Sequence, residues 1–470
     1  MKVDKLNSNN TKFLVTIFII FGILTFGLRA YLNFRQELVP GVNGGYYPLQ
    51  VRYILTNGIL GFSDMPLLFY LDALLLKIIS LFGVSITDQL ILWVVKIVDS
   101  ISIPLLLIPL FNILKLEKHS YSTLFVISIV SFSVLSIEPL ILISDLQKNA
   151  LAITFIFFFI SYILSFLKNK IKFDLILSIV FLILLGLTHF GTFIFGLLFA
   201  FLIIGATYRR NAIIPISISI ILSVVIIFIF DKSRFYRLFS FGSFLFEKPA
   251  ITNGMLTPPD YLVLLFSIIL AIVSIYILIK KNSKLLGYQK ASLLSSIICI
   301  LILSNPYYDI EYLKRLMLFL FIPQTLIILY FSSIVTTKQI KVISALTFVF
   351  TLLSIFNAIA QPKETVIDIN AYKDLQRIKS VIKNDNQTII IARHGLEWWV
   401  AWVLETKVGQ DKSINQDLSQ KYKNVIIINQ LNGFSYERRM THFHEPLILN
   451  NSEKIYSSKY FVVYKINKII

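Results

Sequence analysis

Long apolar runs separated by short polar segments dominate this sequence and restrict it to one class of fold. Hydrophobic residues make up 56% of the 470 residues, and 40 residues are Phe. A soluble domain of this length cannot bury so much apolar surface, so the lipid bilayer must act as its solvent. About eleven runs are long enough to cross a bilayer as helices. These runs are 13–32, 90–113, 121–137, 149–167, 173–188, 190–207, 212–230, 260–280, 286–304, 313–334 and 340–360. The sequence therefore predicts a polytopic α-helical membrane protein.

Short clusters of Lys and Arg occupy every second gap between these runs, and they predict the orientation of the chain. The clusters are Lys115/Lys118, Lys168/Lys170/Lys172, Arg209/Arg210, Lys280/Lys281/Lys284 and Lys338/Lys341. All of them face the cytoplasm if the N-terminus is cytoplasmic and the ambiguous apolar run 65–83 does not cross. Each basic residue near the anionic inner leaflet gains about 1 kcal/mol, which favours this arrangement. The run 65–83 is then a re-entrant or interfacial helix on the outer face.

The charge and cysteine content exclude two other classes of protein. The formal net charge is +18, but the basic residues form short clusters between spans and no continuous stripe, so a nucleic-acid partner is not expected. The single cysteine, Cys299, excludes a disulfide or a thiolate metal site within one chain.

The composition changes near residue 361, which predicts two domains. Residues 1–360 form the membrane domain, and within it 33–89 form an outer loop with interfacial helices, such as an amphipathic helix over Tyr46–Leu60. Residues 361–470 are polar and predict a small extracytoplasmic α/β domain. Its expected elements are helices over Ala371–Lys383 and Leu396–Glu405 and strands over Thr388–Ala392, Asn424–Asn429 and Tyr460–Ile466.

With this orientation, the polar residues able to support chemistry gather on the outer side. The first outer loop contains Glu37, Asn43, Arg52 and Asp64, the second Glu138, Asp145 and Lys148, the third His189, the fourth Arg234 and Arg237, and the fifth Arg315. The outward basic cluster of the fourth loop departs from the positive-inside trend. It is interpreted either as a phosphate site, because Arg forms bidentate bonds with phosphate oxygens, or as a loop that grips lipid headgroups.

Asp145 and His189 each allow a structural and a functional interpretation. Asp145 opens a span, where a carboxylate stabilises a helix N-terminus. It could equally orient an acceptor group or bind Mg²⁺ or Mn²⁺, cations that bridge to phosphate. His189 lies between two spans and is either an interfacial residue or a contact to a substrate phosphate.

Other polar and aromatic patterns favour structural roles. Lys96 and Asp99 lie one turn apart in a span and are expected to pair within the helix. The run Trp398-Trp399-x-x-Trp402 is expected to be a docking face, although Trp also stacks on sugars. His442-x-His444 is half of a metal site at most. The sequence contains no Walker A, GxGxxG or GxSxG motif, so chemistry driven by a bound nucleotide is unsupported.

Several short motifs resemble one family. They are Pro40-Gly41-Val42-Asn43-Gly44-Gly45-Tyr46-Tyr47, Pro66-Leu67-Leu68-Phe69-Tyr70-Leu71, Asp145 at the start of a span, and Thr188-His189. With the long first outer loop and the C-terminal domain, they resemble the C-type (GT-C) glycosyltransferases. Within that class the similarity is to the protein O-mannosyltransferases and the bacterial lipid A aminoarabinose transferases, and it covers most of residues 1–360.

The resemblance implies a hexosyl or pentosyl transferase. Such an enzyme passes a sugar from a polyprenyl-phosphate carrier to a glycan, lipid or protein acceptor at the outer face. It also implies that Asp145 is the acid of the second loop and that Arg234, Arg237 and Arg315 hold the lipid phosphate. The family has an acid before the aromatic pair of the first loop, where this chain has Asn43. Asn cannot accept a proton at neutral pH, so either Glu37 or Asp64 takes that role or the activity is altered or lost.

Two other classes of function are consistent with a multi-spanning chain. A transporter or flippase of lipid-linked glycans would show internal repeats and charges at mid-membrane, whereas this chain has no visible repeat. A polymerase or ligase of lipid-linked glycans would also place basic residues in large outer loops.

Overall fold

The computed structural model describes most of the chain as two compact units. The described residues are 8–117, 121–208, 245–247, 249–250, 256–280, 285–332, 336–382, 387–410, 421–431 and 452–466, with the single residues 221, 236, 334 and 418. The first unit comprises Met1–Gly27, Ile101–Leu142 and Lys148–Gln361, and the second comprises Leu28–Ser100, Ile143–Gln147 and Pro362–Ile470. The first outer loop and the C-terminal segment thus belong to the same compact unit. The domain boundary expected near residue 360 stays a prediction.

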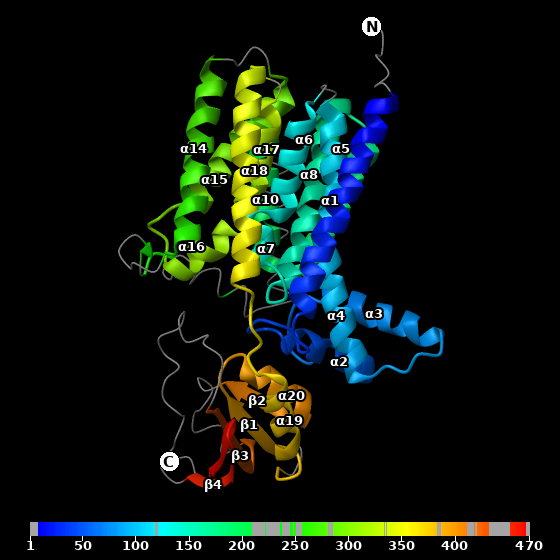
Figure 1. The fold of residues 1–470 in the computed structure, drawn as a ribbon, viewed down its shortest axis with the longest axis vertical. Helices are drawn as coiled ribbons and strands as arrows, with labels where there is room; N and C mark the ends of the chain where they lie inside the picture. The colour runs from blue at the N-terminus through cyan, green and yellow to red at the C-terminus, as the bar shows by residue number, and fades with distance from the viewer. Residues whose placement is uncertain are drawn as a thin grey trace. The chain divides into compact units, whose positions relative to one another are not determined.

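The first unit is a bundle of near-parallel helices (Figure 1). Two helices connect both units, namely α1 (Ser8–Phe34) and α4 (Asp88–Ser102). The bundle also contains η1 (Pro104–Leu106), α5 (Leu107–Glu117), α6 (Thr123–Leu135), α7 (Ile137–Ile141), α8 (Gln147–Asn169), α9 (Lys172–Thr188), α10 (Phe190–Tyr208), α14 (Pro258–Lys280), α15 (Gly287–Leu303), α16 (Ile310–Met317), α17 (Phe321–Phe331) and α18 (Thr337–Ala360).

Local sequence sets the ends of these helices, and small polar residues allow close packing between them. Ser122 caps α6 by accepting from the backbone N–H of Phe125, and Thr336 forms a capping box with Gln339 at the start of α18. Helices α6 and α18 then pack together, and the Ser128 hydroxyl donates to the backbone carbonyl of Ser344 at 2.9 Å. Such contacts between small residues are typical of helices packed within a membrane.

The described helices make the chain a multi-pass membrane protein. Seven of them are long and apolar enough to span a bilayer, or up to eight if α16 and α17, bent by 42°, form one span. Helices α9 and α15 have 17 residues each, which is just below that length. The expected span 212–230 lies outside the described residues.

The second unit begins with two short helices of the first outer loop. They are α2 (Tyr46–Asn57) and α3 (Leu67–Leu81), and they pack against each other. Helix α3 has 15 residues, about 22 Å of helix, and is not among the possible spans. That the run 65–83 does not cross the membrane stays a prediction. Helix α2 buries every residue from Tyr46 to Val51, together with Ile54, so its first half is enclosed on all sides.

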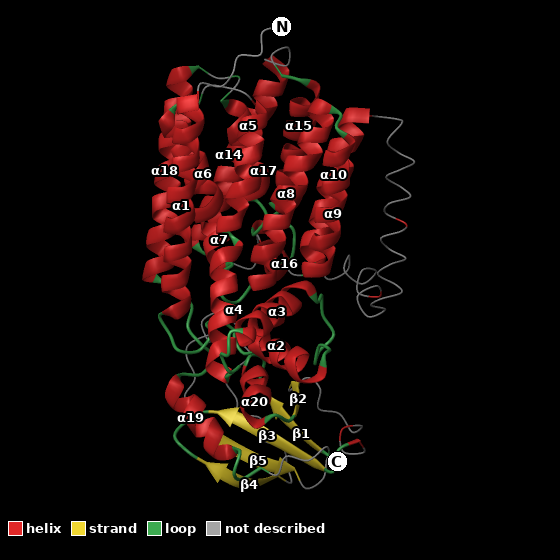
Figure 2. Cartoon of the chain, turned by 90° about the vertical axis from the view of Figure 1, so that its right-hand side faces the viewer, coloured by secondary structure: helices red, strands yellow, loops and turns green. Residues whose placement is uncertain are grey.

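A five-stranded mixed sheet forms the C-terminal part of the second unit. The strands are β1 (Thr388–Ala392), β2 (Lys407–Gln410), β3 (Asn424–Gln430), β4 (Ser452–Ser457) and β5 (Phe461–Ile466), in the order β2-β1-β3-β5-β4. Strand β1 pairs in parallel with β2 and β3, whereas β5 is antiparallel to β3 and β4. The helices of this part are α19 (Ile369–Ile378) and α20 (Leu396–Leu404), and both lie against the sheet (Figure 2).

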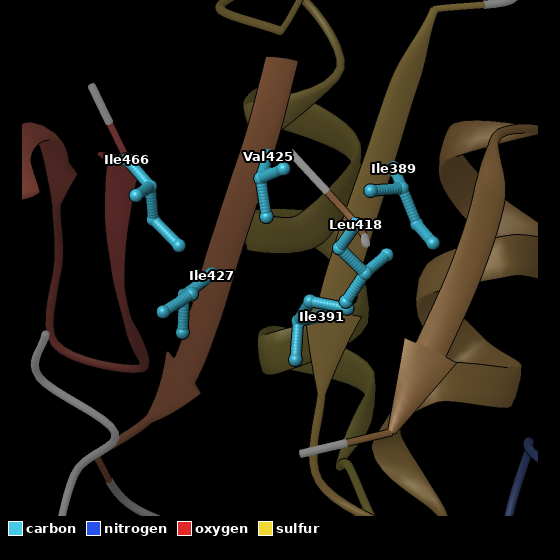
Figure 3. Packing of buried hydrophobic residues seen from close by; sticks show 6 residues of the cluster. All are labelled: Ile389, Ile391, Leu418, Val425, Ile427 and Ile466. Atoms are coloured by element: carbon cyan, nitrogen blue, oxygen red, sulfur yellow. The ribbon is translucent and has the colours of Figure 1, made fainter. Parts of the chain in front are cut away.

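Alternate side chains of the sheet build its core. Ile389, Ile391, Val425 and Ile427 come from neighbouring strands and pack together with Leu418 (Figure 3). The C-terminal segment is therefore an α/β domain, as predicted. The three expected strands and two expected helices are present, while β2 and β4 were not expected.

Candidate active site

A glycine allows the first outer loop to approach Asp145. Gly41 has a φ of +91°, a conformation that favours glycine, and its N–H donates to the carbonyl of Glu364 at 2.8 Å. A Cβ at this position would lie 2.6 Å from the Cβ of Asp145. The motif around Asn43 is therefore held directly against the acid of the second loop.

Backbone and hydroxyl donors hold Asp145 in place. Its Oδ1 accepts from the backbone N–H of Asn43 at 2.8 Å. Its backbone carbonyl accepts from the Tyr47 hydroxyl at 3.1 Å and from the Asn43 side-chain amide at 3.4 Å. The side chain of Asp145 is 15% exposed. The structure thus presents one oriented carboxylate that remains reachable from solvent.

Lys363 is a site residue that the sequence did not single out. Its ammonium lies 4.0 Å from Oδ2 of Asp145 and donates to the carbonyl of Ile143 at 3.1 Å. The segment that carries it is anchored to Gln36, whose Oε1 accepts from the backbone N–H of Thr365 at 2.9 Å. One feature of the sequence could have pointed to Lys363: it is the first basic residue after the last apolar run.

A buried polar network supports the turn that carries Asp145. Arg29 forms an ion pair with Asp99 at 3.0 Å, and both side chains are fully buried. The other Asp99 oxygen accepts from the Asn33 amide at 2.7 Å and from the backbone N–H of Ser144 at 2.9 Å. Ser144 has a φ of +65°, so the network stabilises a strained turn directly before Asp145.

The expected pairing of Lys96 with Asp99 was wrong. Lys96 instead donates to the carbonyls of Gln36 and Glu37 at 2.7 and 2.8 Å. The reason is that Arg29, from a different helix, already compensates the buried charge of Asp99.

Burial changes the acid–base behaviour of two further groups in this unit. The pKa of Tyr47 is raised well above its usual value, first by burial and then by Asp145 and other nearby acids. Its hydroxyl therefore stays protonated and acts as a donor. Burial, with a smaller contribution from Asp99, also raises the pKa of Asp72 on α3 well above its usual value. The carboxyl of Asp72 has no hydrogen-bond partner among the described residues.

The other acids of the first loop have different surroundings. Asp64 accepts from the Tyr46 hydroxyl at 2.5 Å and from the backbone N–H of Met65 at 2.7 Å. It lies near Tyr47, but donors already engage both of its oxygens. Glu37 is exposed, and the contact described for it joins its backbone carbonyl to Lys96.

Arg52 connects helices of the second unit. It forms an ion pair with Asp88 at 2.7 Å and donates to the carbonyl of Trp402 at 2.6 Å. Its guanidinium lies 3.3 Å from the centre of the Trp402 ring. Trp398 of the same helix α20 packs on Tyr46, with ring centres 4.9 Å apart. The aromatic run thus docks the C-terminal domain onto the first loop.

The remaining described candidate residues belong to the first unit. Glu138 is buried in α7, and its carboxylate has no hydrogen-bond partner within the described chain. His189 faces Thr192 in the first turn of α10, with its Nδ1 2.7 Å from that hydroxyl. Arg315 is 72% exposed and lies 3.8 Å from Glu311. Lys148 belongs to the first unit. Arg234 and Arg237, like His442 and His444, lie outside the described residues.

The residues around Asp145 do not fit a metal centre. In the described part of the chain, no three His, Cys, Asp or Glu side chains come together as ligands. Oδ1 of Asp145 is engaged by an N–H group, and a Lys ammonium stands beside Oδ2. A second cation next to this ammonium would be repelled, so these residues do not suit Mg²⁺ or Mn²⁺.

Comparison with known proteins identifies the fold. No protein-family model and no curated protein matches the sequence. The solved structure of apo ArnT from Cupriavidus metallidurans is similar, with a TM-score of 0.54 and 9% identity over 97% of this chain and 98% of that chain. The chain has an ArnT-like fold. ArnT is an aminoarabinose transferase of the GT-C class, so the architecture expected from the resemblance is confirmed.

A second ArnT structure from the same organism, bound to undecaprenyl phosphate, gives a TM-score of 0.47 at 10% identity. It covers 96% of this chain and 97% of that chain.

Proposed function

We propose that this chain is a membrane glycosyltransferase. It moves a sugar from a polyprenyl-phosphate donor to an acceptor hydroxyl at the outer face of the membrane. The observation that carries the proposal is Asp145, an oriented and reachable carboxylate held against the loop of Asn43 and Tyr47. The ArnT-like fold supports the same class of reaction.

Asp145 is the proposed general base. The acceptor oxygen attacks the anomeric carbon, and the bond from that carbon to the phosphate oxygen breaks. The acceptor proton passes to Asp145, while the polyprenyl phosphate leaves with the bonding electron pair. A positioned base of this kind accelerates a reaction by roughly 10²- to 10⁴-fold. Asn43, which cannot take a proton, acts here through its backbone N–H as a support for Asp145.

Asp145 is a better candidate for the base than the two acids of the first loop. Both oxygens of Asp64 accept hydrogen bonds from described donors, whereas Oδ2 of Asp145 accepts none from the described residues and is left for the acceptor hydroxyl. Glu37 is exposed, and its carboxylate interacts with Lys96 rather than with the loop of Asn43. The substitution of Asn43 for the family acid is therefore compatible with an active enzyme that relies on the second-loop carboxylate.

The cation beside Asp145 has a role in the same step. Lys363, 4.0 Å from Oδ2 of Asp145, would contact an oxygen of the departing phosphate while Asp145 binds the acceptor. An ammonium placed where negative charge accumulates lowers the barrier to leaving-group departure. Lys363 joins Arg234, Arg237 and Arg315 as a proposed phosphate contact, and it is the one for which a position next to the base is described.

The test follows label leaving the lipid. The purified full-length protein in lipid is supplied with radiolabelled polyprenyl-phosphate sugars, both hexoses and pentoses. Wild type is expected to release or transfer the label, and Asp145→Asn is expected to lower the rate by at least about 100-fold. Glu405→Gln, which removes an exposed carboxylate paired with Lys379, serves as the control and should keep the wild-type rate.

Two outcomes would count against the proposal. If the label stays on every donor, the protein is a transporter or a non-catalytic protein. A flipping assay with the same lipids would distinguish these two. Full activity in Asp145→Asn would show that Asp145 is not the base, and Glu37 and Asp64 would then be the candidates.

A further inference from the structure

A polar cavity opens at one end of the helix bundle, in the first unit. It lies between the end of α5, the end of α8 and the start of α9, and has a volume of about 340 Å³. Cavities that bind small ligands have volumes of roughly 300–1,000 Å³. Its lining includes Asn112, Lys115, Tyr162, Lys168, Asn169 and Asp174. The site and mechanism proposed above use none of these residues.

Hydrogen-bond donors make up much of the lining of this cavity. Two ammonium groups and two side-chain amides line it together with the carboxylate of Asp174, and the carboxylate of Glu117 lies close to Lys168. The Ser165 hydroxyl donates to Oδ2 of Asp174 at 2.6 Å, which satisfies part of its demand for donors. Lys115 has no ion-pair partner in the described segments and stands over the Phe111 ring at 5.4 Å. The chemistry complementary to this lining is an anion with several acceptor oxygens, such as a phosphate.

Lys168 is held within the cavity wall. Its ammonium donates to the carbonyl of Leu116 at the end of α5 and lies 5.6 Å from the centre of the Tyr288 ring. The carbonyl contact fixes the ammonium at the cavity, where it also lies near the buried carboxylate of Glu117 at the end of α5. A fixed ammonium costs less conformational entropy on binding than a free one, so Lys168 is suited to anchor an anion.

An apolar surface lies next to the cavity. From the start of α9 onward, Phe173, Ile176 and Ile179 are each at least half exposed. On an apolar helix of a membrane protein, such a surface is one that acyl chains cover. The cavity therefore combines a cationic headgroup site with an adjoining surface for lipid tails. Basic pockets between transmembrane helices bind anionic headgroups in this way.

We propose that the cavity around Lys115 and Lys168 binds the phosphate of an anionic membrane lipid. The lipid belongs to the leaflet at this end of the bundle, which also carries the basic loops predicted to be cytoplasmic. This site is distinct from the proposed sugar-transfer site and does not depend on that activity. The binding of a soluble phosphate ester would use the same donors, so the experiment separates the two sources.

Native mass spectrometry of the full-length protein measures the binding. The protein is released from detergent after incubation with phosphatidylglycerol, phosphatidylcholine or soluble glycerol 1-phosphate. Wild type is expected to retain phosphatidylglycerol in preference to phosphatidylcholine. Lys115→Gln is expected to weaken that binding about fivefold, as is typical for loss of one lysine near anionic lipid. Lys168→Gln should weaken it at least as much.

Lys170→Gln is the matched control. Lys170 belongs to the same basic loop, but it lies 3.2 Å from the Tyr208 hydroxyl and does not line the cavity. Its variant should retain phosphatidylglycerol as wild type does. Equal weakening in all three variants would indicate a diffuse surface charge and overturn the proposal. Equal retention of both lipids by wild type, or binding of glycerol phosphate alone, would also overturn it.

If Lys168→Gln does not fold because its contact to Leu116 is lost, Lys115→Gln still decides the question. Lys115 is exposed and has no such structural contact among the described residues.

Discussion

At the scale of single residues, the groups that contact the Asp145 carboxylate are distant from it in sequence. The N–H of Asn43 fixes one carboxylate oxygen, and Lys363 stands by the other. A hydrogen bond to a charged group, such as the one from the N–H of Asn43, is worth about 1.5–3 kcal/mol. Lys363, at 4.0 Å, contributes a positive charge beside the other oxygen.

Replacement of Lys363 tests that role. Lys363→Gln should lower turnover about tenfold to a hundredfold, because the departing phosphate loses a nearby positive charge. Lys363→Arg keeps the charge and should restore part of the rate. The measurement is kcat and KM for label transfer from the polyprenyl-phosphate sugar. Lys379→Gln removes an exposed cation paired with Glu405 and is the control. Unchanged kcat in Lys363→Gln would show that the contact to Asp145 has no catalytic consequence.

Asp72 should make stability dependent on pH. Its folded-state pKa lies above the unfolded value of about 3.9. Between these two values the unfolded chain has lost the proton that the folded chain keeps, so stability falls as pH rises through that interval. Asp72→Asn removes this dependence and should unfold at a higher temperature than wild type near neutral pH. The difference should shrink as pH falls toward 4.

Thermal unfolding of the solubilised protein across this pH range measures the effect. Glu453→Gln, on the exposed edge of β4, should leave the pH profile unchanged. Parallel profiles for wild type and Asp72→Asn would mean that Asp72 ionises freely in the folded protein.

At the scale of elements, the loop before α2 depends on close approach to Asp145. Gly41→Ala places a Cβ where only 2.6 Å is available and also strains a φ of +91°. Gly58→Ala is the matched control, because Gly58 has a φ of +76° but nothing within 4 Å. Each substitution costs about 1–2 kcal/mol of backbone strain.

Only the Gly41 variant should displace the proposed base. We expect Gly41→Ala to lose most of its transfer activity, while Gly58→Ala keeps it, although both lower the unfolding temperature. Activity assays together with thermal unfolding separate these effects. Similar activity in the two variants would show that the loop can move away from Asp145 without harm.

The elements also show what could be predicted from sequence. Apolar runs such as 190–207 and the strand Thr388–Ala392 follow from local hydrophobicity, and the structure places α10 and β1 there. Strands β2 and β4 were missed because they are short and partly exposed, without clear alternation. Lys363 could not be assigned, since its partner Ile143 lies 220 positions earlier in the chain. Likewise, the pairing of Asp99 with Arg29 joins two helices 70 positions apart, so local spacing suggested the wrong partner, Lys96.

At the scale of the whole molecule, orientation in the membrane decides whether the proposed chemistry is possible. A polyprenyl-linked sugar at the outer face requires Asp145 to be extracytoplasmic. The basic clusters predict this, because the loop with Lys168, Lys170 and Lys172 gains about 1 kcal/mol per residue at the anionic inner leaflet. The short length of α3 is consistent with the same arrangement.

Cysteine labelling in intact cells tests the orientation. Cys299 is buried and is first replaced by Ala, giving a chain without cysteine. Lys170→Cys should then react with a membrane-impermeant maleimide only after the cells are opened, because Lys170 is predicted to be cytoplasmic. Glu453→Cys, exposed on β4 of the C-terminal domain, should react in intact cells. The reverse pattern would place Asp145 on the cytoplasmic side, and the donor would then have to be a lipid-linked sugar of the inner leaflet. Because the two cysteines report on opposite faces, each serves as the control for the other.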